Sequence, residues 1–237
     1  MNPKIRNILI IALIVAVVVT FHIVRRNATM RGIESVVISD NRTLLLTPDE
    51  VDSLILAQYP KLLKSDIKDV DCKLIQKTLN SHPYILSSTA RMTMGGKLAV
   101  KVTQHKPVVR AFYHDKEFYV SREGTVMPLS ATHYCHILVG NGDGKGSLTK
   151  IWKLASFLSD NPKYGEVFDQ VYVSPKGDLY LVPKLGSLSI EVGDTNQLAG
   201  KFENLWAFFD QGVNQVGWDM YKSISLKYRD QVVCTKR

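Results

Sequence analysis

The chain has 237 residues, of which 45% are hydrophobic and 22% are charged, and its formal net charge at pH 7 is +8. This composition excludes a disordered chain, and the length suits one large or two small domains. Residues 1–26 hold four of the basic groups and no acidic group, so the remainder carries 26 basic against 22 acidic groups, a net charge of +4. That excess is too small and too dispersed to predict nucleic-acid binding.

Residues 8–24 read ILIIALIVAVVVTFHIV and contain no charged side chain. This run predicts a transmembrane helix, with a cytoplasmic tail at residues 1–7 and a linker at residues 25–32. A cleaved secretory signal is the alternative, but Arg26 stands where a cleavage site after Ala28 requires a small residue. Basic residues flank the run on both sides, so charge does not settle the orientation. The short tail favours a single-pass protein with an exported C-terminal body.

Residues 33–106 have the pattern of a β-α-α-β-β module. A first strand spans residues 33–38, and Thr47-Pro48-Asp49-Glu50 forms a capping box at the start of a helix. A second helix starts near Asp69 or Asp71 and ends before His82-Pro83. A hairpin with a Gly95-Gly96 turn follows, with alternating side chains on both strands. The prediction is an antiparallel sheet with one face buried under two helices.

Residues 107–237 form short β-rich runs separated by turn residues, which predicts a second domain with a mostly antiparallel sheet. Two helices interrupt it, at about residues 147–158 and 197–209. The expected strands are 108–112, 118–120, 136–139, 167–173, 179–182, 188–190 and the final hairpin. The fold class is therefore α+β, with one N-terminal transmembrane helix, the β-α-α-β-β module and this β domain.

The last hairpin is the strongest candidate site. Ile224, Leu226 and Tyr228 alternate with Ser225 and Lys227 on the expected first strand, a turn lies at residues 229–231, and residues 232–234 return. A terminal strand leaves one row of backbone groups open unless a second strand pairs with it, so we expect a partner segment to add a strand here. An ordinary core strand is a compatible alternative. The candidate partner-binding residues are Ile224, Leu226, Lys227, Tyr228, Arg229, Gln231, Val232 and Val233.

No constellation in the sequence predicts chemistry. The glycine-rich stretch 140–147 has the wrong spacing for a phosphate loop, and His133-Tyr134-Cys135-His136 alternates faces on an extended chain, which disfavours a shared metal. Three widely spaced cysteines do not form a disulfide framework, although one pairing stays open in an oxidising compartment. Arg91, Lys97 and Lys101 are most simply a solvated strand face. We predict no catalytic residue, no cofactor and no metal.

Several stretches, in order along essentially the whole chain, resemble the bacterial cell-division family FtsQ/DivIB. They are Pro83-Tyr84-Ile85 with Ala90, Leu98 to Val102, Lys106 to Val109, Arg122-Glu123-Gly124, Ile224 to Tyr228, and Gln231-Val232-Val233. Three departures from the family pattern indicate a distant branch: Gln104-His105, Ser225 to Tyr228, and a last turn without Asn-Gly.

The resemblance implies a polypeptide-transport-associated (POTRA) module at residues 33–106 and a β domain at residues 107–237 that binds the division proteins FtsB and FtsL. Other division proteins would bind the POTRA-like module. It implies a non-enzymatic scaffold in the bacterial inner membrane at the division septum, with a periplasmic body, linked to septal peptidoglycan synthesis. The alternatives are a membrane-anchored periplasmic cell-wall enzyme, or a POTRA-type component of protein export or outer-membrane assembly.

Overall fold

A computed structural model of the chain describes residues 3–26, 29–39, 43–142, 144–184, 188–210 and 220–237. The chain divides into two compact units. The first unit comprises Met1–Ile38 and Leu46–Gln104, and the second unit comprises Ser39–Leu45 and His105–Arg237. Residues 1–2 of the expected tail and 27–28 of the expected linker lie outside the described residues.

Helix α1 spans Pro3–Arg26 and contains the apolar run. Across the residues that the structure describes, no helix has both the length and the apolar character needed to cross a bilayer. The prediction of a single N-terminal transmembrane helix is therefore wrong.

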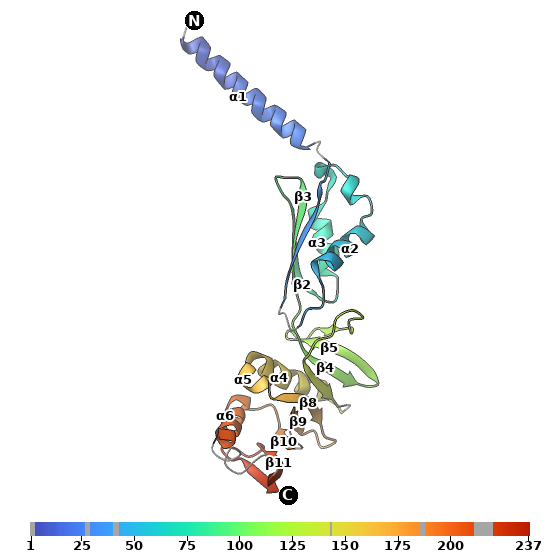
Figure 1. Cartoon of the computed structure of the whole chain (residues 1–237), viewed down its shortest axis with the longest axis vertical. Coiled ribbons are helices and arrows are strands. Elements are labelled where there is room, and N and C mark those ends of the chain that lie inside the picture. The colour runs from blue at the N-terminus through green and yellow to red at the C-terminus, as the bar shows by residue number, and fades with distance from the viewer. Residues whose placement is uncertain (1–2, 27–28, 40–42, 143, 185–187, 211–219) are drawn as a thin grey trace. The chain divides into compact units, whose positions relative to one another are not determined.

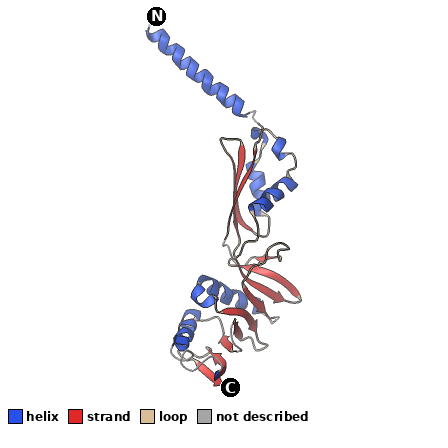
Figure 2. Ribbon diagram, in the orientation of Figure 1, coloured by secondary structure: helices blue, strands red, loops and turns tan. Residues whose placement is uncertain are grey.

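The first unit follows the predicted element order, with two short 3-10 helices added between its α-helices (Figure 1). Its elements are β1 (Gly32–Ile38), α2 (Pro48–Gln58), η1 (Leu62–Lys64), η2 (Ile67–Asp69), α3 (Cys72–Asn80), β2 (Ile85–Met92) and β3 (Lys97–Gln104). Figure 2 shows both α-helices on one side of the three strands. They bury Val51, Ile55, Ile75 and Leu79 in one apolar cluster with Leu98, Val100 and Val102 of β3.

Local signals fix the starts of both helices. The capping box of α2 is confirmed: Thr47 Oγ1 accepts a bond from the Glu50 N–H at 3.3 Å, and the Thr47 N–H donates to Glu50 Oε2 at 2.8 Å. Asp71 caps α3, because its carboxylate accepts bonds from the Lys73 and Leu74 N–H groups, both at 3.0 Å. Caps of this kind satisfy N–H groups that have no partner inside the helix.

The first sheet differs from the predicted antiparallel one. Its strand order is β1-β3-β2, and β1 runs parallel to β3. The chain passes through both helices between β1 and β3, and such a crossover connection allows parallel pairing. Only the β2–β3 hairpin is antiparallel, as the glycine turn requires.

The second unit contains a nine-stranded sheet in the order β12-β11-β10-β9-β8-β7-β4-β5-β6. The strands are β4 (Pro107–Tyr113), β5 (Lys116–Ser121), β6 (Val126–Met127), β7 (Leu138–Asn141), β8 (Phe168–Val173), β9 (Leu179–Pro183), β10 (Ser189–Gly193), β11 (Tyr221–Ser225) and β12 (Val233–Lys236). The helices are α4 (Ser147–Asp160), α5 (Pro162–Gly165) and α6 (Leu198–Phe208). The pairs β4–β7, β7–β8 and β10–β11 are parallel, so the sheet is mixed.

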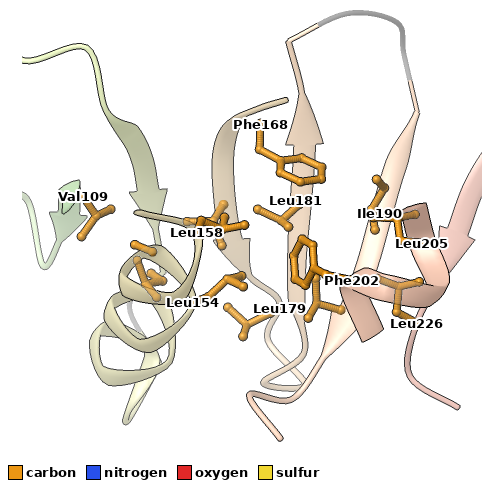
Figure 3. Close-up of a cluster of buried hydrophobic side chains, with 14 of the residues drawn as sticks. Val109, Leu154, Leu158, Phe168, Leu179, Leu181, Ile190, Phe202, Leu205 and Leu226 are labelled. Carbon is orange, nitrogen blue, oxygen red and sulfur yellow. The ribbon is translucent and has the colours of Figure 1, made fainter. Parts of the chain in front are cut away.

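One face of this sheet carries the core of the second unit. Apolar side chains from neighbouring strands are buried together in one cluster. Helices α4 and α6 add Leu154, Leu158, Phe202 and Leu205 to this cluster (Figure 3). Helix α4 packs closely against the sheet at Gly140 of β7, where a Cβ atom would lie 2.6 Å from Ile151 Cγ2 of α4. This close approach explains a glycine inside a strand.

Candidate functional site

The second unit ends in a hairpin of β11 and β12, as the sequence predicts. Ile224 lies opposite Cys234 and Ser225 opposite Val233 in antiparallel register. β12 lies at the end of the sheet and, within the described residues, pairs with β11 alone. Alternate backbone N–H and C=O groups of an edge strand point away from its only neighbour and can bond a further strand.

The first strand of the hairpin ends earlier than predicted. β11 stops at Ser225, and just beyond its end the Leu226 N–H donates to the Glu191 carbonyl of β10 at 2.7 Å. The connection therefore runs over residues 226–232 and is longer than the expected turn at 229–231. Asp230 turns the chain with φ of +56°, a left-handed conformation that Asp tolerates better than most residues.

The predicted partner-binding residues separate into two groups. Ile224 and Leu226 are buried in the core of the second unit, and Val232 packs against it, so these three side chains hold the hairpin in place. The exposed members are Lys227, Tyr228, Arg229, Gln231 and Val233. Tyr228 does not share a face with Ile224 and Leu226, as the alternation predicted, but is 58% exposed in the loop. Only the exposed group can meet a partner through side chains.

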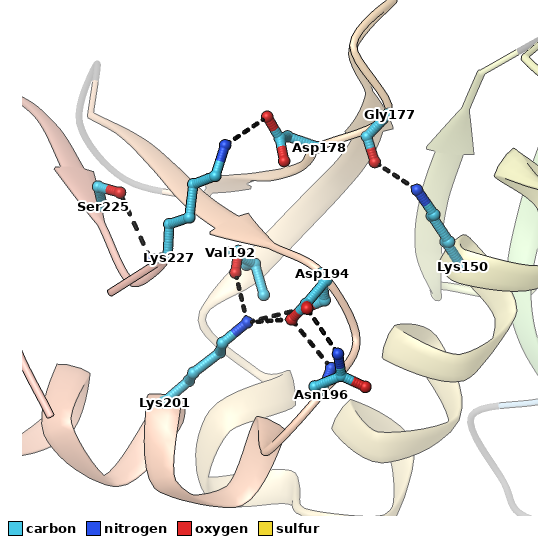
Figure 4. A network of polar contacts seen from close by, with 9 residues as sticks. All are labelled: Lys150, Gly177, Asp178, Val192, Asp194, Asn196, Lys201, Ser225 and Lys227. Carbon is cyan, nitrogen blue, oxygen red and sulfur yellow. Dashed lines mark hydrogen bonds and ion pairs between the residues drawn. The ribbon is translucent and has the colours of Figure 1, made fainter. Parts of the chain in front are cut away.

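An ion pair that the sequence did not indicate fixes Lys227. Its ammonium lies 2.9 Å from Asp178 Oδ2, in the turn between β8 and β9 (Figure 4). The hydrogen bond to Asp178 raises the pKa of Lys227. The carbonyl of the preceding residue, Gly177, accepts a bond from Lys150 Nζ of α4 at 2.6 Å. The hairpin loop is thus joined to a turn that is itself held by α4, and no sequence signal links residues this far apart in the chain.

A second polar cluster lies beside the same loop, at the start of α6. Lys201 Nζ donates to the Val192 carbonyl at 2.9 Å and to Asp194 Oδ1 at 2.7 Å, and Asp194 also accepts a bond from Asn196 Nδ2 at 2.6 Å (Figure 4). Asp194, Asn196 and Lys201, with the hairpin loop 226–231, border a cavity of about 150 Å³.

The Asp194–Lys201 contact predicts a pH dependence. The hydrogen bond from Lys201 lowers the pKa of Asp194 below its ordinary value of 3.8. A carboxyl group with a lowered folded-state pKa stabilises the fold above its unfolded pKa, and this contribution is lost as the pH falls through the folded pKa. We expect Asp194→Asn to lower the urea midpoint at pH 7 and to change it much less at pH 2.5. An equal effect at both pH values would contradict this contact.

The other constellations do not form a chemical site. Cys135 is buried, and burial raises the pKa of its thiol to about 11, so the thiol stays neutral at pH 7. Tyr134 instead lies over the Arg110 guanidinium, 5.4 Å from the ring centroid. In the part of the chain that the structure describes, no three His, Cys, Asp or Glu side chains gather where they could hold a metal ion. Residue 143 of the glycine-rich stretch lies outside the described residues.

The second unit is thus a mixed sheet with β12 at one end, and exposed side chains lie in the loop beside this edge strand. The model of the family described as FtsQ/DivIB, C-terminal related, matches residues 106–235, which is more than half of the chain. The chain belongs to the FtsQ/DivIB family of cell-division proteins, a non-enzymatic family associated with the division site. No curated protein matches the chain.

Proposed function

We propose that this protein is a cell-division scaffold that binds FtsB- and FtsL-like partners through β12 and links them to septal peptidoglycan synthesis. The observation that carries the proposal is the position of β12 at the end of the nine-stranded sheet, paired only with β11 among the described residues. A partner strand added to this edge gains main-chain hydrogen bonds, and neighbouring side chains select its sequence.

The surroundings of β12 support this use of the edge. Val233 is 44% exposed on β12, and Tyr228 and Arg229 are exposed in the connecting loop. Tyrosine and arginine, together with tryptophan, are enriched among the residues that dominate binding energy at protein interfaces. The buried side chains of Ile224 and Leu226 hold the hairpin so that the edge is preorganised.

The first unit has a separate role in this proposal. Its order of β1, α2, α3, β2 and β3, with two helices on one face, fits a POTRA-type module. Such a module has its own core and can contact other division proteins independently of β12. The scaffold would then join partners through two different surfaces.

Two proline substitutions test the β12 edge. Neighbouring residues of a strand point their N–H groups in opposite directions, so one of Val233→Pro and Cys234→Pro removes a bond to β11 and the other removes only an outward N–H. The variant that loses only the outward N–H is recognised by its wild-type urea stability. We expect this variant to capture the purified FtsB–FtsL complex about tenfold less well or worse. Capture is measured by biolayer interferometry on the full chain.

Val126→Pro in β6, at the opposite end of the same sheet, is the matched control and should leave capture unchanged. Wild-type capture by both folded β12 variants would contradict the proposal. Loss of capture in Val126→Pro, with its fold intact, would also contradict it, because the effect would then not be specific to β12.

A further inference from the structure

Within the residues that the structure describes, a single ion pair fastens the loop between β11 and β12 to the rest of the second unit. Residues 227–231 of this loop are exposed. The contact of Lys227 with Asp178 is the only ion pair or hydrogen bond that leads from them to an element outside the hairpin. Their other hydrogen bonds, such as that from the Lys227 N–H to Ser225 Oγ at 3.4 Å, stay inside the hairpin. The position of the loop therefore depends on Asp178.

Asp178 is a firm anchor, because the turn between β8 and β9 is bonded within itself. The Gly177 N–H donates to the Ser174 carbonyl at 2.8 Å, and the Ser174 N–H donates to the Asp178 carbonyl at 2.9 Å. Ser174 Oγ accepts a further bond from the Asp178 N–H at 3.2 Å. Gly177 has φ of +89°, a conformation that glycine adopts at no steric cost, and its carbonyl accepts the bond from Lys150 of α4. The carboxylate of Asp178 therefore stands on a turn with little freedom to move.

A glycine lets Lys227 reach this anchor. Strand β10 lies between β11 and β9, so the side chain of Lys227 has to cross β10. A Cβ on Gly193, the last residue of β10, would lie 3.2 Å from Lys227 Cγ and 3.4 Å from Lys227 Cβ. Gly193 in turn pairs with Leu179, the residue that follows Asp178. The stem of Lys227 therefore packs against bare backbone at Gly193, and its ammonium meets Asp178 beyond β10.

The ion pair adds little to the stability of the fold. The side chains of Lys227 and Asp178 are 46% and 21% exposed, and an ion pair in contact with solvent contributes little to the free energy of unfolding. Its effect is local, because it removes freedom from a loop that would otherwise have to be ordered when a partner binds. Tyr228 and Arg229 follow Lys227 directly in the chain, so the pair fixes the point from which their side chains extend.

We propose that Asp178 is a positioning residue for partner binding and that it acts through Lys227. It holds the loop in one conformation, in which Tyr228 and Arg229 are presented beside β12. Asp178 lies 49 residues before Lys227 in the chain and outside the hairpin, so it influences the partner without contacting it. This inference rests on the proposed function and deepens it, because it assigns the Lys227 ammonium to the turn between β8 and β9 and not to the partner.

Charge reversal on the full chain tests this role. Asp178→Lys sets two ammonium groups against each other, so we expect it to capture the purified FtsB–FtsL complex about three- to tenfold less well, with a urea midpoint close to wild type. Lys227→Asp should have a similar effect. The exchange variant Asp178→Lys/Lys227→Asp restores the pair with its charges swapped and should recover most of the capture. The matched control is Asp169→Lys, at an exposed position near the start of β8, which changes the net charge equally and should capture as wild type.

Backbone ¹⁵N relaxation of the chain without partner reads the loop directly. In Asp178→Lys the order parameters of residues 228–230 should fall toward the values of flexible loops, below about 0.6, and the exchange variant should raise them again. Unchanged order parameters, wild-type capture by Asp178→Lys, an equal loss in Asp169→Lys, or no recovery in the exchange variant would each overturn the inference. If the folded β12 proline variant still loses capture in the same assay, the proposed function stands although this inference has failed.

Discussion

Replacing Phe202 by alanine is expected to lower the free energy of unfolding of the second unit by about 3–5 kcal/mol. The Phe202 ring is fully buried, and its centroid lies 5.3 Å from Phe157, 5.4 Å from Tyr164 and 5.9 Å from Phe168. These rings come from α4, α5 and β8, so Phe202 joins α6 to three other elements. Alanine would leave a cavity between elements that cannot all move inward. The loss in the free energy of unfolding would therefore exceed the transfer free energy of the removed ring atoms.

Urea unfolding followed by tryptophan fluorescence measures the change, with Phe112→Ala as the matched control. Phe112 is 41% exposed, and the Arg110 guanidinium lies 5.8 Å from its ring centroid. We expect the control to lose about 1 kcal/mol or less. Equal losses in the two variants would mean that Phe202 is not central to the core.

Local sequence signals predicted most elements because each signal acts over a few residues. The capping box of Thr47 and Glu50, the Asp71 start of α3 and the glycine turn before β3 are all confirmed. Short β-rich runs between turn residues likewise located β4, β5, β7, β8, β9 and β10 within a few residues. These patterns report the burial of one face of an element, which does not depend on the neighbour that covers it.

Pairing between distant segments could not be predicted in the same way. Whether β1 runs parallel or antiparallel to β3 depends on the path through α2 and α3, and alternation is identical in both cases. The Lys227–Asp178 ion pair and the Leu226–Glu191 backbone bond also join residues far apart in sequence. For the candidate site, alternation located the hairpin but assigned Tyr228 to the wrong face, because the strand ends at Ser225.

Leu226 and Tyr228 are two residues apart, yet alanine at these two positions should have very different effects on the free energy of unfolding. Leu226 is 1% exposed and packs in the core of the second unit, so Leu226→Ala should lower the free energy of unfolding by about 2–5 kcal/mol. Tyr228 is 58% exposed, so Tyr228→Ala should change stability by about 0.5 kcal/mol or less. Urea unfolding of the two variants measures both values.

Partner binding then separates the structural role from the binding role. Tyr228→Ala should weaken capture of the FtsB–FtsL complex about tenfold, because an exposed aromatic ring beside the open edge supplies contact area to an added strand. A photo-reactive phenylalanine analogue at position 228 should crosslink to the same partner in living cells. If Tyr228→Ala captures the complex as wild type does and no crosslink forms, the loop lies outside the interface. Wild-type capture by Leu226→Ala would show that the position of the loop does not matter, because that variant loosens the hairpin without removing any exposed group.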